Sequence, residues 1–322
     1  MVRKNSSLKE MARELIKAES VLIFPHVLMD GDALGSAAAL CSTLRNLGKE
    51  VYILVEDPVP QYLQFLDKDY CTEEQEILGD QDISIAVDCG DDKRFPKRAK
   101  RFHRAKVEMC LDHHRTSQGI YDYNYIDSGA AATGEIVYDL LLAMEAEVSK
   151  EEAEALFAAI TTDTGNFQYS NTTKRTHQIV MELYDLGLDS NAVSVELYEN
   201  ETMEKLLLHS KVMDTLEIIE GGRGAIATLT QKMLGECNAK MEHSEGIVEI
   251  IRSIKGVEVA VLLKENDTSL VKASMRSKRQ VDVGDIAAKY HGGGHMRAAG
   301  CTLYTPIEKA CEIMVEELKK VL

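Results

Sequence analysis

The sequence predicts an α/β protein with two domains: an N-terminal domain on a mostly parallel sheet and a smaller C-terminal α/β domain. In the first half, short continuous apolar runs alternate with segments of helical periodicity, which is typical of parallel strands buried on both faces. A second set of strand-like runs begins after Gly221-Gly222-Arg223-Gly224. The chain has 322 residues, which is enough for two hydrophobic cores.

The first domain is expected to span residues 1–187. Its apolar runs predict buried strands at 21–24, 51–55, 83–87 and 107–111. Helical spacing of apolar residues predicts helices at 7–18, 33–47, 131–146, 151–161 and 174–186. Gly48 is expected to cap the second of these helices at its C-terminus.

The second domain is expected to span residues 219–322. Residues 188–218 look helical and carry no strong glycine or proline break, which predicts a helical connector between the domains. The predicted strands of the second domain are 225–229, 257–263 and 269–275, and its predicted helices are 244–254 and 307–320.

Composition argues against several classes of protein. No apolar run approaches the ~20 residues that span a bilayer, and no signal-like segment is present, so we predict a cytoplasmic protein that does not bind membranes. The formal net charge of −16 argues against binding along long duplex nucleic acid. Seven cysteines without a CxxC pair argue against a disulfide framework or a structural zinc site. The stretch 272–297 supplies local positive charge for an anionic substrate.

Residues with metal-ligand chemistry follow three of the predicted strands. They are His26-x-x-x-Asp30-x-Asp32 after the first strand, Asp88 after another, and Asp112-His113-His114 after a third. In open α/β sheets, sites form beyond the carboxyl ends of the strands, so these clusters are expected to share one site. A further aspartate, Asp163, stands in Thr161-Thr162-Asp163-Thr164-Gly165.

Most of these residues have an ordinary structural explanation when taken singly. Asp30 suits an N-cap or turn, Asp88 a turn at a strand end, Asp163 a helix C-terminal turn, and His26 a packed histidine. Three metal-competent residues in a row at 112–114 are harder to explain in this way. Taken together, the clusters predict a metal site with the ligands His26, Asp30, Asp32, Asp88, His113 and Asp163.

The mixture of ligands indicates the kind of metal. Carboxylates favour hard divalent cations and imidazole shifts the preference toward transition metals, so we expect two divalent cations: Mn²⁺ first, with Mg²⁺ or Co²⁺ as alternatives. Two such ions about 3.5–4 Å apart need a bridging ligand and activate a water between them. The set therefore predicts a two-metal hydrolase of phosphate esters.

The second predicted domain holds a candidate substrate loop. His291-Gly292-Gly293-Gly294-His295 places three glycines between imidazoles, and glycines let a backbone approach a phosphate closely. Arg276 ends a predicted strand, where an arginine can hold a phosphate through two hydrogen bonds. The alternatives are a flexible loop and a solvated surface charge.

These motifs resemble those of the DHH phosphoesterase superfamily, specifically the DHH/DHHA1 branch that includes bacterial oligoribonucleases with pAp phosphatase activity. The four clusters of the first domain are similar to the four motifs of that superfamily, in the same order. His291–His295, followed by Ala298-Ala299-Gly300, resembles the DHHA1 signature. The resemblance covers nearly the whole chain.

The resemblance implies a role for each site residue. One ion is held by His26, Asp30 and Asp88, and the other by Asp32, Asp88, His113 and Asp163. The implied catalytic residues are Asp88 as the bridging ligand, His114 facing the substrate phosphate, and Asp112 orienting a ligand. The implied substrate-binding residues are Arg276, Gly292, Gly293, Gly294 and His295.

The expected reaction is hydrolysis of short oligoribonucleotides or of 3′-phosphoadenosine 5′-phosphate (pAp), in which a metal-bridging hydroxide attacks phosphorus. A soluble phosphodiesterase of cyclic or linear dinucleotides stays open, as does a nucleotide-sensing module without activity. A RecJ-like processive nuclease and a family II pyrophosphatase are weaker alternatives, given the chain length and the DHHA1 signature. The expected partner is short RNA or a small nucleotide, and a homodimer is compatible with the family.

Overall fold

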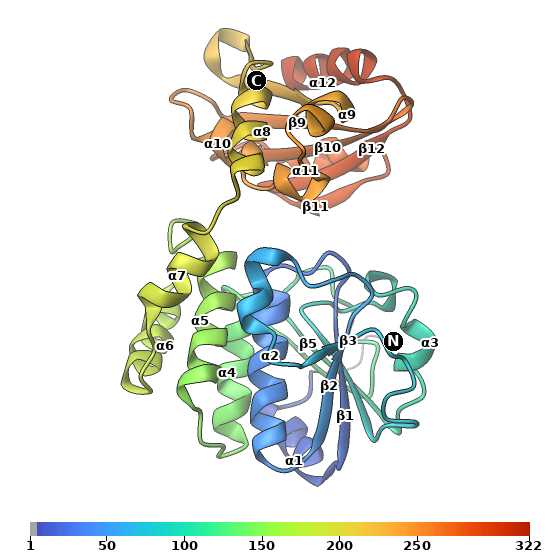
Figure 1. Cartoon of the computed structure of the whole chain (residues 1–322), viewed down its shortest axis with the longest axis vertical. Helices are drawn as coiled ribbons and strands as arrows, with labels where there is room; N and C mark the ends of the chain where they lie inside the picture. The colour runs from blue at the N-terminus through green and yellow to red at the C-terminus, as the bar shows by residue number, and fades with distance from the viewer. Residues whose placement is uncertain (1–4) are drawn as a thin grey trace. The chain divides into compact units, whose positions relative to one another are not determined.

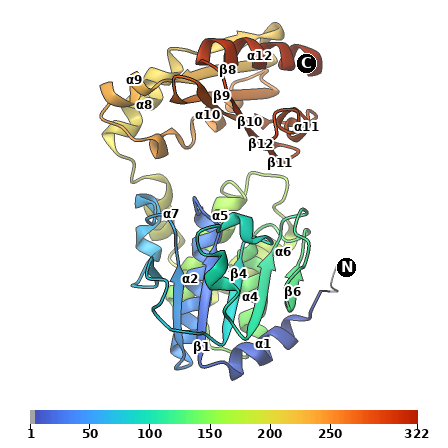
Figure 2. The same ribbon diagram turned by 90° about the vertical axis from the view of Figure 1, so that its right-hand side faces the viewer.

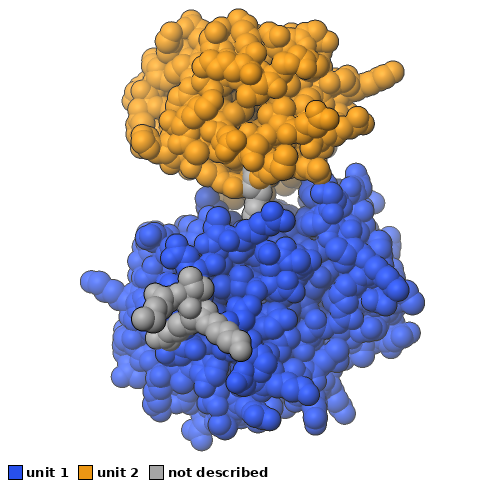
Figure 3. All heavy atoms as spheres, turned by 180° about the vertical axis from the view of Figure 1, so that it is seen from behind, with its two compact units in different colours: residues 1–200 blue, residues 201–322 orange. Residues whose placement is uncertain are grey.

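The computed structural model describes residues 5–322, except for the side chain of His295. The chain forms two compact units, whose boundary in the sequence lies between Asn200 and Glu201 (Figure 3). Each unit has its own six-stranded sheet, with a hydrophobic core on each face of that sheet. The predicted combination of an N-terminal parallel sheet and a second α/β region is confirmed.

The first unit is built on a parallel sheet in which the strands follow the order β3-β2-β1-β4-β5-β6. The strands are β1 (Ser20–Pro25), β2 (Glu50–Leu54), β3 (Cys71–Thr72), β4 (Ile83–Val87), β5 (Val107–Asp112) and β6 (Tyr123–Ile126). The chain runs outward from β1 to β3 and then returns to β4 on the other side of β1. Ligands of such sheets bind beyond the carboxyl ends of the strands at this reversal.

Both faces of this sheet are buried. In β1, Val21 and Ile23 pack in the core that contains α2, α4 and α5, whereas Leu22 and Phe24 pack in a second core on the other face. Figure 1 shows α2, α4 and α5 together on one side of the strands and α3 on the other. The helices are α1 (Leu8–Lys17), α2 (Gly31–Asn46), α3 (Ala99–Phe102), α4 (Thr133–Ala143), α5 (Lys150–Asp163), α6 (Lys174–Asp185) and α7 (Ser190–Tyr198), with 3-10 turns at Gln61–Leu66 and Asp92–Arg94.

The second unit is built on a mixed sheet in the order β11-β12-β10-β9-β8-β7, in which only β8 and β9 pair in parallel. Its strands are β7 (Glu217–Ile219), β8 (Gly224–Leu229), β9 (Val259–Asp267), β10 (Leu270–Ser277), β11 (Gly293–His295) and β12 (Ala298–Leu303). Its helices are α8 (Met203–Met213), α9 (Gln231–Glu236), α10 (Ile247–Ser253), α11 (Val283–Ala288) and α12 (Ile307–Val321), with 3-10 turns at Glu220–Gly222 and Met241–Ser244. Helices α11 and α12 pack on one face, and α8, α9 and α10 pack on the other (Figure 2).

The predicted connector at 188–218 differs from the structure. Instead of one helical segment, α7 ends at Tyr198, and α8 begins after Thr202, whose side chain accepts a hydrogen bond from the backbone of Lys205. This cap starts a new helix without glycine or proline, which is why the break left no strong signal in the sequence. Helix α7 packs in the core of the first unit and α8 in a core of the second. None of the described helices has the length and apolar composition that crossing a bilayer requires.

Candidate metal centre

Separate segments bring the predicted ligands to the carboxyl edge of the first sheet. His26 follows β1, Asp88 follows β4 and His113 follows β5. Asp30 is the N-cap of α2, and Asp163 is the last residue of α5. Together with Asp32, they form overlapping groups of potential ligands beyond the strand ends on both sides of the chain reversal. The expectation that these clusters share one location is therefore met.

Asp88 stands at the centre of the cluster. Its Oδ2 lies 3.4 Å from His26 Nε2, and its Oδ1 lies 3.6 Å from His113 Nε2. The two oxygens of one carboxylate thus face two groups of potential ligands, which is the arrangement that a bridging ligand requires. Asp88 adopts a left-handed backbone (φ 60°), a conformation that is costly without glycine and that turns the chain as soon as β4 ends.

The groups on either side of Asp88 are compact. On one side, His26 Nε2 lies 3.7 Å from Asp30 Oδ1. On the other, His113 Nε2 lies 3.8 Å from Asp32 Oδ2 and 3.6 Å from Asp163 Oδ2. Within each group the ligand atoms lie within 4.8 Å of one another, so a single cation could contact them all. The grouping is compatible with the two ligand sets that the resemblance implies.

Both histidines present the same ring nitrogen to the carboxylates. His26 Nδ1 lies 2.8 Å from the carbonyl oxygen of Val27, and His113 Nδ1 lies 3.4 Å from that of Ala130. When Nδ1 donates its proton to a carbonyl, Nε2 keeps its lone pair. Nε2 is also the nitrogen that faces Asp88 in both residues, so each ring is oriented as a metal ligand would be.

Asp32 is held in place by the N-terminus of α4. The backbone N–H of Thr133 donates to Asp32 Oδ2 (2.7 Å), while the N–H of Gly134 and the hydroxyl of Ser36 donate to Oδ1 (2.9 and 3.0 Å). The hydroxyl of Thr133 donates to Asp88 Oδ1 at 2.7 Å. Thr133 therefore positions two candidate ligands at once. Sequence reasoning missed it, because its only signal is its place near the start of a predicted helix.

Asp112 supports its neighbour His114 instead of joining either ligand group. Its Oδ1 accepts hydrogen bonds from the backbone N–H of His114 (3.1 Å) and from Nδ1 of the ring (2.7 Å), and Ser117 donates to its other oxygen. Burial disfavours the charged form of His114, but the hydrogen bond to Asp112 and the charge of Asp88 outweigh it and raise the pKa to about 8. His114 itself lies in a group of potential ligands with Asp88 and His113.

Two glycines of α2 allow α5 to approach closely. A Cβ on Gly31 would lie 2.5 Å from the side chain of Thr162, and a Cβ on Gly35 would lie 2.5 Å from the carbonyl oxygen of Ala155. A side chain at either position would push α5 away from α2. Because Asp163 follows Thr162, this packing is what brings the last candidate ligand to the cluster.

The cluster concentrates buried negative charge, and the pKa values respond to it. Burial and the charges of Asp88 and Asp163 raise the pKa of Asp32 well above its usual value, and burial also raises the pKa of Asp163 to about 7. Burial opposes protonation of His26, but hydrogen bonds to Asp30 and Asp88 raise its pKa to about 10. A divalent cation would supply the positive charge that protons supply in these states, so the donor set fits such a cation.

The second unit places the other predicted residues on one sheet. Arg276 lies in β10 opposite Ala298 of β12, and its Nε donates to Glu249 Oε1 at 2.8 Å. The glycine segment is not the loop that the sequence suggested. Gly293, Gly294 and the backbone of His295 form β11, because the following Ala298-Ala299-Gly300 offers a strand edge to pair with. Gly292 directly precedes β11, and the side chain of His295 lies outside the described part of the structure.

Comparison with known proteins agrees with this architecture. Residues 20–160 match the family model described as "DHH family, N-terminal domain", and residues 222–322 match the one described as "DHHA1 domain". The "Bifunctional oligoribonuclease and PAP phosphatase NrnA" of Thermus thermophilus is 32% identical, over 97% of this chain and 94% of that protein. The protein of the same name from Bacillus subtilis is 27% identical, over 92% and 93% of the two chains.

Solved structures support the fold. An exopolyphosphatase-related protein from Bacteroides fragilis is 26% identical and superposes with a TM-score of 0.91 over 97% of this chain and 95% of that one. The exonuclease RecJ bound to manganese superposes with a TM-score of 0.52 at 15% identity, over 100% and 96% of the chains. The sequence matches over both units, together with the identity to the Thermus protein, show that this chain belongs to the DHH family, with a DHHA1 domain after its DHH domain.

Proposed function

We propose that this protein hydrolyses phosphate esters of short oligoribonucleotides and of pAp, in a reaction that depends on two divalent cations, Mn²⁺ before Mg²⁺ or Co²⁺. The observation that carries the proposal is the position of Asp88, whose two carboxylate oxygens face two separate groups of Asp and His ligands. The substrate class is supported by relatives that are named as oligoribonucleases and PAP phosphatases and that match nearly the whole chain.

The cluster would divide its ligands between two cations. His26, Asp30 and Asp88 would hold one, and Asp32, Asp88, His113 and Asp163 would hold the other. When bound, divalent cations supply positive charge for the phosphoryl oxygens and make a water acidic enough to act as a nucleophile near neutral pH. Thr133 would fix the position of the Asp32 carboxylate relative to that of Asp88, because it donates a hydrogen bond to each.

His114 would contact the phosphate directly. Because Nδ1 donates to Asp112, a protonated His114 can donate from Nε2 to a phosphoryl oxygen and stabilise the charge that develops there. Asp112 acts through His114, so its role is positioning. Arg276 and the glycines of β11 would bind the part of the substrate that is not hydrolysed, with the guanidinium exchanging Glu249 for a phosphate.

The test is hydrolysis by metal-free protein after addition of Mn²⁺, Mg²⁺ or Co²⁺, with pAp, pApA, longer RNA, cyclic di-AMP and pyrophosphate as substrates. We expect AMP from pAp and mononucleotides from pApA. Asp88→Asn and His113→Ala should lose at least ~1,000-fold in kcat/KM, on the order expected when an essential charge-stabilising group is removed. Asp189→Asn, which removes only the negative charge of the exposed N-cap of α7, should keep full activity.

Other outcomes would redirect the assignment. Hydrolysis of cyclic di-AMP in preference to pAp and pApA would favour the dinucleotide phosphodiesterase. Stoichiometric binding of divalent cations without turnover of any of these substrates would favour a nucleotide-sensing module. Full activity of Asp88→Asn would contradict the proposed centre itself.

A further inference from the structure

Asn171, in the turn between α5 and α6, joins two segments that carry parts of the metal centre. Its side-chain nitrogen donates to the carbonyl oxygen of Ala131 at 2.9 Å and to that of Asp163 at 3.0 Å. An amide nitrogen carries two N–H groups, so both bonds can form at once. The amide oxygen is buried and accepts no hydrogen bond from the described residues. Asn171 therefore acts through its nitrogen, as a bridge between two carbonyl groups.

The bond to Asp163 supplies a partner that the helix cannot provide. Asp163 is the last residue of α5, and the last carbonyl groups of a helix have no partner within it. No backbone N–H of the described residues donates to the Asp163 carbonyl, and the Asn171 side chain donates instead. This bond fixes the peptide group next to the Asp163 carboxylate, whose Oδ2 lies 3.6 Å from His113 Nε2.

The other bond of Asn171 holds the segment that leads into α4. Residues 130–133 of this segment contact three candidate ligands: His113, Asp32 and Asp88. Asn171 holds the carbonyl of Ala131, and the N–H of the same residue donates to Glu135 Oε2 at 3.2 Å. The bridge thus ties the segment that aims these ligands to the end of the helix that carries Asp163.

The turn that carries Asn171 is strained. Gly165, Asn166 and Phe167 follow one another in the left-handed region, with φ of 56°, 55° and 63°. Residues other than glycine adopt this backbone at a cost, and such strain collects at functional sites. The ring of Phe167 stacks on that of His177 in α6, with the centroids 5.5 Å apart, and so helps to hold the turn. The strain indicates that the return of the chain to the end of α5 serves the site.

We propose that Asn171 is a positioning residue for the second cation: by joining the Ala131 and Asp163 carbonyls, it holds the Asp163 carboxylate within reach of that cation. The inference rests on the proposed function and concerns the first unit alone. The first ligand set does not include Asp163, and Glu135 still holds the Ala131 N–H when the Asn171 amide is removed. Loss of the amide should therefore weaken binding of the second cation and spare the first.

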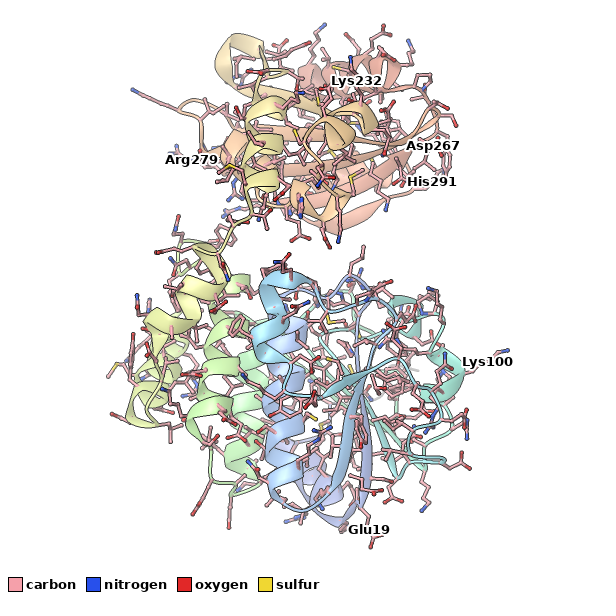
Figure 4. All side chains as sticks on the ribbon, in the orientation of Figure 1. Glu19, Lys100, Lys232, Asp267, Arg279 and His291 are labelled. Atoms are coloured by element: carbon pink, nitrogen blue, oxygen red, sulfur yellow. The ribbon has the colours of Figure 1, made fainter. Side chains whose placement is uncertain are left out.

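The test variant is Asn171→Leu, which keeps the size of the side chain and removes both N–H donors; Asn171→Ala, which removes the same donors without adding bulk, repeats the test should the leucine disturb folding. The matched control is Asn46→Leu. Asn46 Nδ2 donates to Glu152 Oε1 at 3.0 Å and so joins α2 to α5 at the end of α5 opposite Asp163. A second control, Lys100→Ala, removes an exposed charge of α3 that points away from the unit in Figure 4.

Binding of Mn²⁺ to the metal-free, full-length protein is measured by calorimetry, and hydrolysis of pAp is measured over a range of Mn²⁺ concentrations. The wild type should bind two cations. Asn171→Leu should bind the first with unchanged affinity and the second about 10- to 100-fold more weakly, as expected when a group supporting a ligand is lost. Excess Mn²⁺ should restore its hydrolysis. Asn46→Leu should lower Tm but keep both affinities, and Lys100→Ala should change neither.

The outcomes separate this inference from the proposed function. If the wild type binds two cations and both Asn171 variants bind them with wild-type affinity, the positioning role is refuted and the proposed function stands. An equal loss of the second cation in Asn46→Leu also refutes the role, because the effect then follows from stability. If two cations bind but no substrate is hydrolysed, the proposed function fails and calorimetry still decides the role of Asn171. A wild type that binds fewer than two cations overturns both.

Discussion

Replacing Thr133 with valine tests how the metal centre is held together. Valine keeps the shape of threonine and the backbone N–H that donates to Asp32, but it removes the hydroxyl that donates to Asp88 Oδ1 at 2.7 Å. A hydrogen bond to a charged group is worth about 1.5–3 kcal/mol, and loss of such a supporting partner weakens metal affinity about 10- to 100-fold. Because Asp88 faces both ligand groups, we expect the binding of both cations to weaken.

The assay is a calorimetric titration of metal-free protein with Mn²⁺, followed by pAp hydrolysis at limiting and saturating metal. Thr133→Val should need about 10- to 100-fold more Mn²⁺ for half-maximal activity and should recover part of its kcat at saturation. Thr133→Ser retains the hydroxyl and should stay within about 3-fold of the wild type. Wild-type affinity in the valine variant would refute the reasoning. Equal losses in the serine and valine variants would show that the methyl group, and not the hydrogen bond, matters.

Three further predictions use other parts of the structure. Gly292→Ala should lower the free energy of unfolding by about 1–3 kcal/mol, because the added Cβ would meet the backbone of β12. Gly293→Ala should leave Tm unchanged and weaken substrate binding. Thermal denaturation measures the first effect and calorimetry the second. Metal-free protein should lose stability as pH rises from about 4 to 7, because the pKa of Asp163 is raised to about 7 in the folded state, which therefore binds this proton more tightly than the unfolded chain. Thermal melts in the presence of a chelator should show this loss, and Asp163→Asn should reduce it. Arg98→Met should cost about 3–5 kcal/mol in urea unfolding, because it removes the only cation paired with the buried Glu56 carboxylate among the described residues, at 3.3 Å, and leaves it the backbone N–H groups of Lys97 and Arg98. A cost under about 1 kcal/mol would contradict this.

The sequence predicted the first unit well because its signals are local. Continuous apolar runs mark strands buried on both faces, and the predicted strand 83–87 coincides with β4. Asp88 and the Asp112-His113-His114 run directly follow or end strands, so strand position alone was enough to bring them together. Asp30 shows why single residues were ambiguous: it caps α2 through Ala33 N–H at 3.0 Å and also faces His26. The structural interpretation holds for this residue, and its position beside His26 is compatible with the functional one.

The supporting residues could not be predicted in the same way. Thr133 and Arg98 act on groups that are far away in the sequence: Thr133 donates to Asp32, and Arg98 donates to the carbonyl oxygen of Pro25 at 2.9 Å. Such pairings depend on the tertiary fold and leave no periodic pattern. In the second unit, β7 and β11 have only three residues each, too few for strand periodicity to show. The glycines of β11 also lack the β-branched side chains typical of strands.

The strand order of the first unit has a consequence for how the protein is made. All groups of the first ligand set, His26, Asp30 and Asp88, have been synthesised once the ribosome passes residue 88, and β1 and β4 can pair as soon as both have left the ribosome. The second set is complete only after α5 has been made, because Asp163 is its last residue. If each set holds a cation as proposed, the first set would not need α5 for its cation, whereas the second would bind one only after α5 has docked on α2.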